Sequence, residues 1–238
     1  MFVKFAAAVP RMCAVNKTAL IAATRRSFAS LELVTRSGAK LAKSLEKEIK
    51  YENDNYNQLE DIETFLRESG FTYTEQEHGV KMSLTKTVGD KKVEILFEAR
   101  QPQADEEQPE EHQDANEQEQ GMSENYCDFT IIVSDASGKS GMIVEATSMD
   151  TEVNYNSVMV TDDIAGQKSV HRFDRQMKAY VGPDFSTLDE RIQTSLTEYL
   201  EGFGVNEHLC AFVECMSLDK DQRLYMEWLA KLKQFVEV

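Results

Sequence analysis

The stretch from residue 186 to 238 places the strongest constraint on the fold, because its pattern predicts three consecutive amphipathic helical runs. Thr187 and Glu190 match a capping box at the start of the first run. Asn206 can cap the second run, and Asp219 is predicted to open the third. No helix can bury its own apolar stripe, so a sheet or a partner subunit must cover these runs. The three stripes comprise Leu188, Ile192, Leu196, Tyr199 and Phe203; Leu209, Phe212, Val213 and Met216; and Leu224, Tyr225, Trp228, Leu229, Leu232, Phe235 and Val236.

The stripe of the third run is rich in aromatic side chains. Tyr225, Trp228 and Phe235 could be read as a ligand-binding box, but their helical spacing is more typical of a core or an interface. We therefore predict that four residues lie in the core or at an oligomer interface: Leu224, Trp228, Leu232 and Phe235.

Between about residues 71 and 181 the hydrophobic period changes to two, which is typical of strands. Gly79 and Gly89 mark short turns, and strands joined so tightly must be antiparallel. About seven strands are predicted, at residues 71–74, 80–85, 92–97, 127–133, 142–146, 155–160 and 175–181.

Residues 35–70 are predicted to be mainly helical, with a break at residues 51–57, where Asn and Asp gather, and a stop at Gly70. Helices therefore flank the strands at both ends of the chain. The fold class is α+β, with a twisted antiparallel sheet of about seven strands, one N-terminal helix and C-terminal helices.

The charge is divided unevenly along the chain. Five of the 26 Lys and Arg fall within residues 1–30, which hold no Asp or Glu, so residues 31–238 carry 21 basic against 42 acidic side chains, a balance of −21. The basic, acid-free segment is typical of a mitochondrial presequence, and Arg26-Ser27-Phe28 matches a matrix-peptidase site. A basic N-terminal helix of the fold is the alternative. We expect residues 31–238 to form a single acidic domain.

The acid excess is densest at about residues 101–125, where no Lys or Arg interrupts the run of Asp, Glu and Gln. Such a segment cannot bury enough apolar surface to offset its ordering entropy, so it is predicted to be a disordered acidic loop between two strands. It either solubilises the protein or binds basic proteins. The residues predicted to bind partners are Asp105, Glu106, Glu107, Glu110, Glu111, Asp114, Glu117 and Glu119.

The motifs that could bind a ligand or catalyse a reaction lack residues or spacings that such sites require. The GKS at residues 138–140 lacks the first glycine of a phosphate-binding loop, because Val133 occupies that position. His208 and Cys210 could begin a zinc site, but no second ligand pair follows. No EF-hand spacing or Ser-His-Asp order stands out either. We therefore expect no catalytic, cofactor-binding or metal site and a protein that is not an enzyme; a metal-dependent enzyme using buried carboxylates is the alternative.

A series of short pieces in the C-terminal half resembles the mitochondrial acidic matrix protein family, whose members are complement C1q-binding protein-like. The resemblance extends more weakly from about residue 40 to the C-terminus. The pieces are Tyr180, Gly182-Pro183, Phe185, Leu188-Asp189-Glu190, Tyr199-Leu200-Glu201, Gly204-Val205-Asn206, Tyr225, Trp228-Leu229, Leu232 and Phe235.

This resemblance implies a ring-shaped homotrimer of seven-stranded subunits in the mitochondrial matrix. It also implies a multi-partner or chaperone-like scaffold that binds basic proteins, including RNA-binding and ribosomal ones, and supports RNA processing or editing, translation and respiratory function. No apolar stretch reaches the length needed to cross a bilayer. The alternative is direct binding of guide RNA or mRNA through a local basic patch, for which the candidates are Lys81, Lys86, Lys91 and Lys92.

Overall fold

A computed structural model describes residues 31–56, 61–99 and 126–237, so the predicted presequence and the predicted acidic loop lie outside the described residues. Two compact units divide them, one with residues 31–51 and 229–237 and the other with the described residues from 52 to 228. The elements are α2 (Leu31–Asn55), α3 (Asp61–Ser69), β1 (Thr72–Glu75), β2 (Lys81–Val88), β3 (Lys91–Glu98), β4 (Tyr126–Ser134), β5 (Gly141–Met149), β6 (Glu152–Thr161), α4 (Ile164–Ser169), α5 (Arg172–Lys178), a 3-10 turn (Phe185–Thr187), α6 (Glu190–Glu201) and α7 (Glu207–Glu237).

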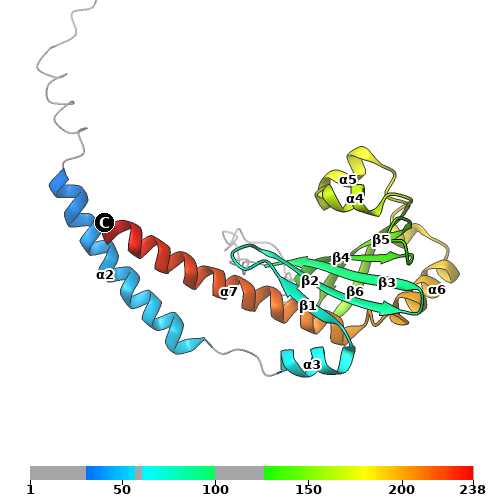
Figure 1. Cartoon of the computed structure of the whole chain (residues 1–238), viewed down its shortest axis with the longest axis horizontal. Helices are drawn as coiled ribbons and strands as arrows, with labels where there is room; N and C mark the ends of the chain where they lie inside the picture. The colour runs from blue at the N-terminus through cyan, green and yellow to red at the C-terminus, as the bar shows by residue number, and fades with distance from the viewer. Residues whose placement is uncertain (1–30, 57–60, 100–125, 238) are drawn as a thin grey trace, which may run out of the picture. The chain divides into compact units, whose positions relative to one another are not determined.

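The larger unit is built on a sheet whose strand order, β1-β2-β3-β4-β5-β6, is the order of the chain (Figure 1). Every pairing is antiparallel, and the register of β5 on β6 shifts between Glu145 and Ala146, where Asn156 is the extra residue of β6. Six of the predicted strands and the α+β class are confirmed. Among the described residues the seventh predicted strand is absent: residues 172–178 form the helix α5, and only an isolated bridge joins Ser157 to Asp184.

The apolar face of this sheet packs against α6, α7 and α3. Alternate residues of the strands point to this face because the side-chain period of a strand is two. Asn206 caps α7 as predicted, since its Oδ1 accepts a hydrogen bond from the Leu209 backbone N at 3.1 Å. The core holds Leu84, Val93, Ile95, Phe97, Phe129, Ile131, Val144 and Ala146 of the sheet with Leu200, Val205, Leu209, Phe212, Val213 and Met216 of the helical segments.

Two predicted helix starts are wrong. The first helix begins two residues later than the capping box indicated, because Asp189 and not Thr187 is the cap of α6, and its side chain accepts a hydrogen bond from the Arg191 backbone N. The third run does not begin at Asp219, because α7 continues through that residue without a break. The predicted break at residues 51–57 is placed too early, because α2 continues through Asn55. The stop at Gly70 is confirmed, and Gly70 has a positive φ of 72°.

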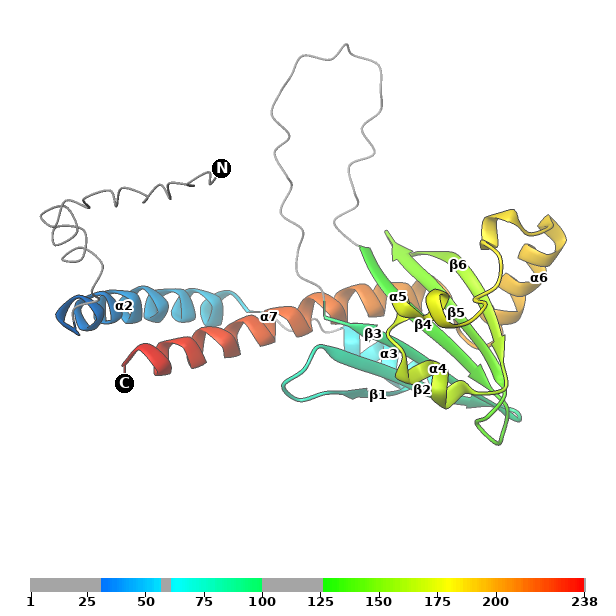
Figure 2. The same cartoon turned by 90° about the horizontal axis from the view of Figure 1, so that it is seen from above.

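The smaller unit pairs α2 with the end of α7, and the two helices lie antiparallel and side by side (Figures 1 and 2). Ala42 and Leu45 of α2 and Leu229 of α7 are buried. A Cβ atom at Gly38 would lie 3.2 Å from the carbonyl oxygen of Val236, so glycine allows the two backbones to approach closely.

Candidate partner-binding face

The sheet face opposite α7 is polar where β4 and β5 pair. Asp128 stands directly across from Thr147, and Thr130 stands directly across from Glu145. In each pair the threonine hydroxyl donates a hydrogen bond of 2.8 Å to the carboxylate opposite. The four residues form a square, called here the carboxylate square, in which both acidic side chains have one fixed orientation.

The helix α5 lies over this square and supplies two arginines to it. Arg172 and Arg175 are three residues apart, so they share one face of the helix. Arg172 forms an ion pair with Asp128, and Arg175 forms one with Glu145. Arg175 is only 5% exposed, and its Nε also donates to the carbonyl oxygen of Gln167 at 3.1 Å. The square therefore binds two guanidinium groups that the chain itself provides.

Further polar groups extend this arrangement along the same sheet face. The Tyr126 hydroxyl donates to Asp128 Oδ1 at 2.8 Å, and burial together with this bond raises the pKa of Tyr126. Lys168 of α4 reaches Glu94 of β3 with an Nζ–Oε1 distance of 2.6 Å. The strands thus contribute the carboxylates and the α4–α5 segment contributes the cations, so the acidic sheet face is matched by a basic segment.

Two cavities flank α5 on this face. One, of about 490 Å³, is lined by residues that include Phe97, Asp128 and Arg172. The other, of about 420 Å³, is lined by residues that include Glu145, Asn156 and Arg175. Arg172 and Arg175 line both of these surface hollows.

A second ionic cluster joins α7 to the end of β1. Arg223 binds both carboxylate oxygens of Glu75 at 2.9 and 2.8 Å and also reaches Asp219 at 2.8 Å. Lys220 is 1% exposed, and its Nζ lies 2.8 Å from the Gln76 carbonyl oxygen and 3.3 Å from Glu75. This cluster explains why α7 does not break at Asp219, whose side chain is buried in it.

The cluster also changes the protonation of its members. The Arg223 guanidinium holds the pKa of Glu75 at about 2, and Tyr73 helps by donating to the same carboxylate. Burial and the hydrogen bond to Asp219 raise the pKa of Tyr56 to about 12. Both shifts keep Glu75 ionised and Tyr56 protonated at neutral pH, which are the forms that their hydrogen bonds require.

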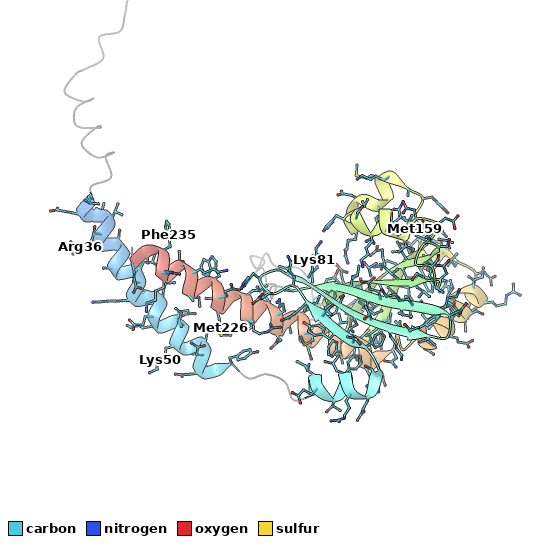
Figure 3. All side chains as sticks on the ribbon, in the orientation of Figure 1. Arg36, Lys50, Lys81, Met159, Met226 and Phe235 are labelled. Atoms are coloured by element: carbon cyan, nitrogen blue, oxygen red, sulfur yellow. The ribbon has the colours of Figure 1, made fainter. Side chains whose placement is uncertain are left out.

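The structure places the predicted partner and interface residues differently. The eight acidic residues predicted to bind partners, Asp105 to Glu119, all lie outside the described residues. Of the predicted core or interface residues, Leu224 and Leu232 are half-buried, whereas Trp228 is 55% and Phe235 79% exposed in the single chain. Figure 3 labels Phe235 near the end of α7. The exposed pair suits an interface better than a core.

The weaker candidates do not come together. His208 is exposed and Cys210 is buried, because residues two apart on a helix do not face each other. Within the described residues, no group of three or more His, Cys, Asp and Glu side chains could hold a metal ion. Residues 138–140 lie in the turn before β5 and at its edge, and not at the start of a helix.

The four lysines proposed for direct RNA binding are divided between the two sheet faces. Lys81 and Lys92 have the parity of the polar face, whereas Lys86 and Lys91 have the parity of the core face. Lys86 lies over the Phe71 ring, with Nζ 5.2 Å from the ring centroid. They do not form one basic patch.

Sequence reasoning did not identify the carboxylate square. Its four members lie on strands that were predicted, but only the register of β4 against β5 brings each threonine opposite an acid. The spacing of Arg172 and Arg175 was a usable signal, since it gives one basic face if the segment is helical.

Comparisons of the sequence with known proteins agree on the relationship. The profile of the MAM33 family, described as mitochondrial glycoprotein, matches residues 45–236. The mitochondrial acidic protein mam33 of Schizosaccharomyces pombe is 28% identical over 102 residues, which is 42% of this chain and 38% of that relative. The match thus spans well under half the length of the curated relative.

Two solved structures share the fold. One is a protein of unknown function from Leishmania major, described as a sequence homologue of human p32; it has a TM-score of 0.65 and 20% identity over 84% of this chain and 99% of that one. The other is the Trypanosoma brucei p22 protein, with a TM-score of 0.61 and 20% identity over 84% of this chain and 98% of that one.

Proposed function

Because the chain belongs to the MAM33, or mitochondrial glycoprotein, family, we propose that it is a non-enzymatic acidic protein of the mitochondrial matrix that binds basic partner proteins. The observation that carries this proposal is the balance of −21 over residues 31–238. A surface with this charge attracts basic proteins and repels phosphate. The relative named as a mitochondrial acidic protein supports the compartment.

The carboxylate square supports the same reading, because it is an internal example of how this sheet binds arginine. Its two carboxylates are already oriented by threonine hydroxyls, so little side-chain entropy is lost when a guanidinium group binds. At physiological salt the screening length is about 8 Å, so recognition depends on contacts of this kind and not on distant charges.

We further propose that the partners act in mitochondrial RNA processing or editing, translation and respiratory function, and that three copies assemble as a ring. The family resemblance motivates both statements. Light scattering that gives the mass of a monomer for the mature protein would refute the ring.

No helix among the described residues is long and apolar enough to cross a bilayer.

A capture experiment from mitochondria tests the function. The mature protein, immobilised at about 50 and 200 mM salt, is expected to retain basic proteins mainly at the lower concentration. Deletion of residues 101–125 should weaken capture while the circular dichroism spectrum stays unchanged. Equal capture by the deletion variant would move the site to the folded faces.

A second assay separates the remaining readings. Protein-free RNA should bind weakly to the purified protein at physiological salt, because the acid excess repels phosphate. Tight binding with a steep salt slope would favour the direct RNA-binding alternative. Activity screens with and without a chelator should detect no turnover, and a chelator-sensitive activity would favour the enzyme alternative.

The N-terminal segment has its own test. Import should remove roughly the first 28 residues, because the basic segment ends in a matrix-peptidase pattern. N-terminal sequencing of the endogenous protein checks the cut, and an intact Met1 would contradict it.

A further inference from the structure

The side chains of α5 that the structure describes reach the sheet mainly through charged groups. A small apolar cluster on this face, around Ile132, Ile143, Met159 and Ile164, includes no described side chain of α5. Met177 of α5 is instead 82% exposed. Its described anchors on the sheet are therefore the ion pairs of Arg172 and Arg175.

Two surface hollows of about 490 and 420 Å³ lie along α5, and both are lined by Arg172 and Arg175. Asp128 lines the larger hollow and Glu145 lines the smaller one, so each carboxylate of the square borders surface space that a ligand could enter.

An unsatisfied acceptor lies on the neighbouring helix. Gln167 Oε1 is fully buried and is the one such side-chain atom without a hydrogen-bond partner in the part of the chain that the structure describes. The Gln167 main-chain carbonyl, by contrast, accepts from Arg175. Buried acceptors are nearly always paired, so the resident arrangement of α4 and α5 lacks a donor that another ligand could supply.

We propose that the carboxylate square is the site where this protein binds an arginine-bearing helix of a basic partner, and that α5 is the occupant that such a helix displaces. This inference rests on the proposed function and adds a second binding location, on the folded sheet, to the predicted acidic segment at residues 101–125. The partner presents two arginines three residues apart, the spacing that Arg172 and Arg175 already show.

The chemistry of the square selects arginine over the other cations. Asp128 and Glu145 each present a carboxylate whose orientation a threonine fixes, and the planar guanidinium matches that geometry better than the point charge of lysine does. Nucleic acid cannot occupy the square, because its phosphates would face two carboxylates. A single basic helix is therefore the occupant.

The test uses a helical alanine-based peptide of about 16 residues that carries two arginines three positions apart. Companion peptides carry lysines at these positions, or arginines two positions apart. Affinity is measured by fluorescence anisotropy with the mature protein at low and physiological salt. Hydrogen exchange read by mass spectrometry over residues 164–179 reports whether α5 leaves the sheet.

Two opposite variants decide the outcome. The double variant Arg172→Gln/Arg175→Gln removes the competing occupant and should bind the first peptide at least about tenfold more tightly. Adding Asp128→Asn/Glu145→Gln to that variant, where the arginines of α5 no longer compete, should weaken binding at least about tenfold relative to it. Glu63→Gln/Glu68→Gln on α3 is the matched control, since it removes the same charge from exposed positions and should leave affinity nearly unchanged.

Each result has a distinct reading. If the unmodified protein binds the peptide and neither square variant changes the affinity, the location is wrong while the proposed function stands. If the unmodified protein and the Arg172→Gln/Arg175→Gln variant both fail to bind basic peptides or basic proteins at low salt, the proposed function fails as well. If the Arg172→Gln/Arg175→Gln variant self-associates in light scattering instead, a second copy is the occupant and the inference is overturned.

Discussion

The ionic cluster around Glu75 predicts a specific dependence of stability on pH. The pKa of Glu75 falls from about 4.5 in the unfolded chain to about 2 in the folded protein, chiefly because Arg223 binds both carboxylate oxygens of Glu75. A shift of this size has an upper bound of about 3 kcal/mol. The side chain is 28% exposed, so solvent screening reduces the expected contribution to about 1–2 kcal/mol.

The variant Glu75→Gln should therefore lose about 1–2 kcal/mol of unfolding free energy at pH 7. A carboxyl whose pKa is lowered by folding stabilises the protein above its unfolded pKa and loses this effect as pH falls through its folded pKa. The gap between the two proteins should consequently close between about pH 5 and pH 2. Urea denaturation at fixed protein concentration, at several pH values, measures it.

The neighbouring carboxylate of Glu77 provides the control. It is exposed, and the structure shows only its main-chain carbonyl near Lys220. Glu77→Gln should cost little at any pH. A gap for Glu75→Gln that stays constant down to pH 2, or an equal loss for Glu77→Gln, would refute the assignment of this pH dependence to the Arg223 pair.

Three further changes test other parts of the fold. Thr151 is a β-branched residue with a φ of 67°, and glycine in its place keeps the backbone N–H that donates to Glu214, so Thr151→Gly should add about 0.5–1 kcal/mol and raise the melting temperature in calorimetry. Asn206→Ala should cost about 1 kcal/mol in urea denaturation, whereas Asn206→Asp, which can also cap α7, should cost much less. Because Trp228 and Phe235 are largely exposed in the single chain, changing both to Ala should weaken assembly more than subunit stability; light scattering over a dilution series would show an unchanged oligomer if this reasoning is wrong.

The helix and strand periods predicted most of this fold, and the errors arise where distant partners decide the outcome. Asp219 looked like a helix start because Asp is a common cap. In the structure its carboxylate accepts from Tyr56 at 2.8 Å and from Arg223 at 2.8 Å, so long-range hydrogen bonds replace the capping role. No local pattern around Asp219 contains that information.

The segment at residues 175–181 shows the same limit for strands. It was predicted as the seventh strand, yet residues 172–178 are helical. Arg172 and Arg175 reach Asp128 and Glu145 together only when they lie three apart on a helix face. Since those acids are distant in the sequence, the candidate site could be assembled only after the register of β4 on β5 was known.

The chain order of the strands has a consequence for which insertions the fold tolerates. β3 and β4 are adjacent and antiparallel in the sheet, so Glu98 and Tyr126, which the connection joins, lie at the same end of that pair. The closure entropy of a connection grows only with the logarithm of its length, about 0.6 kcal/mol for each doubling. Insertions at this point should therefore be tolerated, which makes it the natural place to introduce a fluorescent or affinity tag without disturbing the pairing on either side.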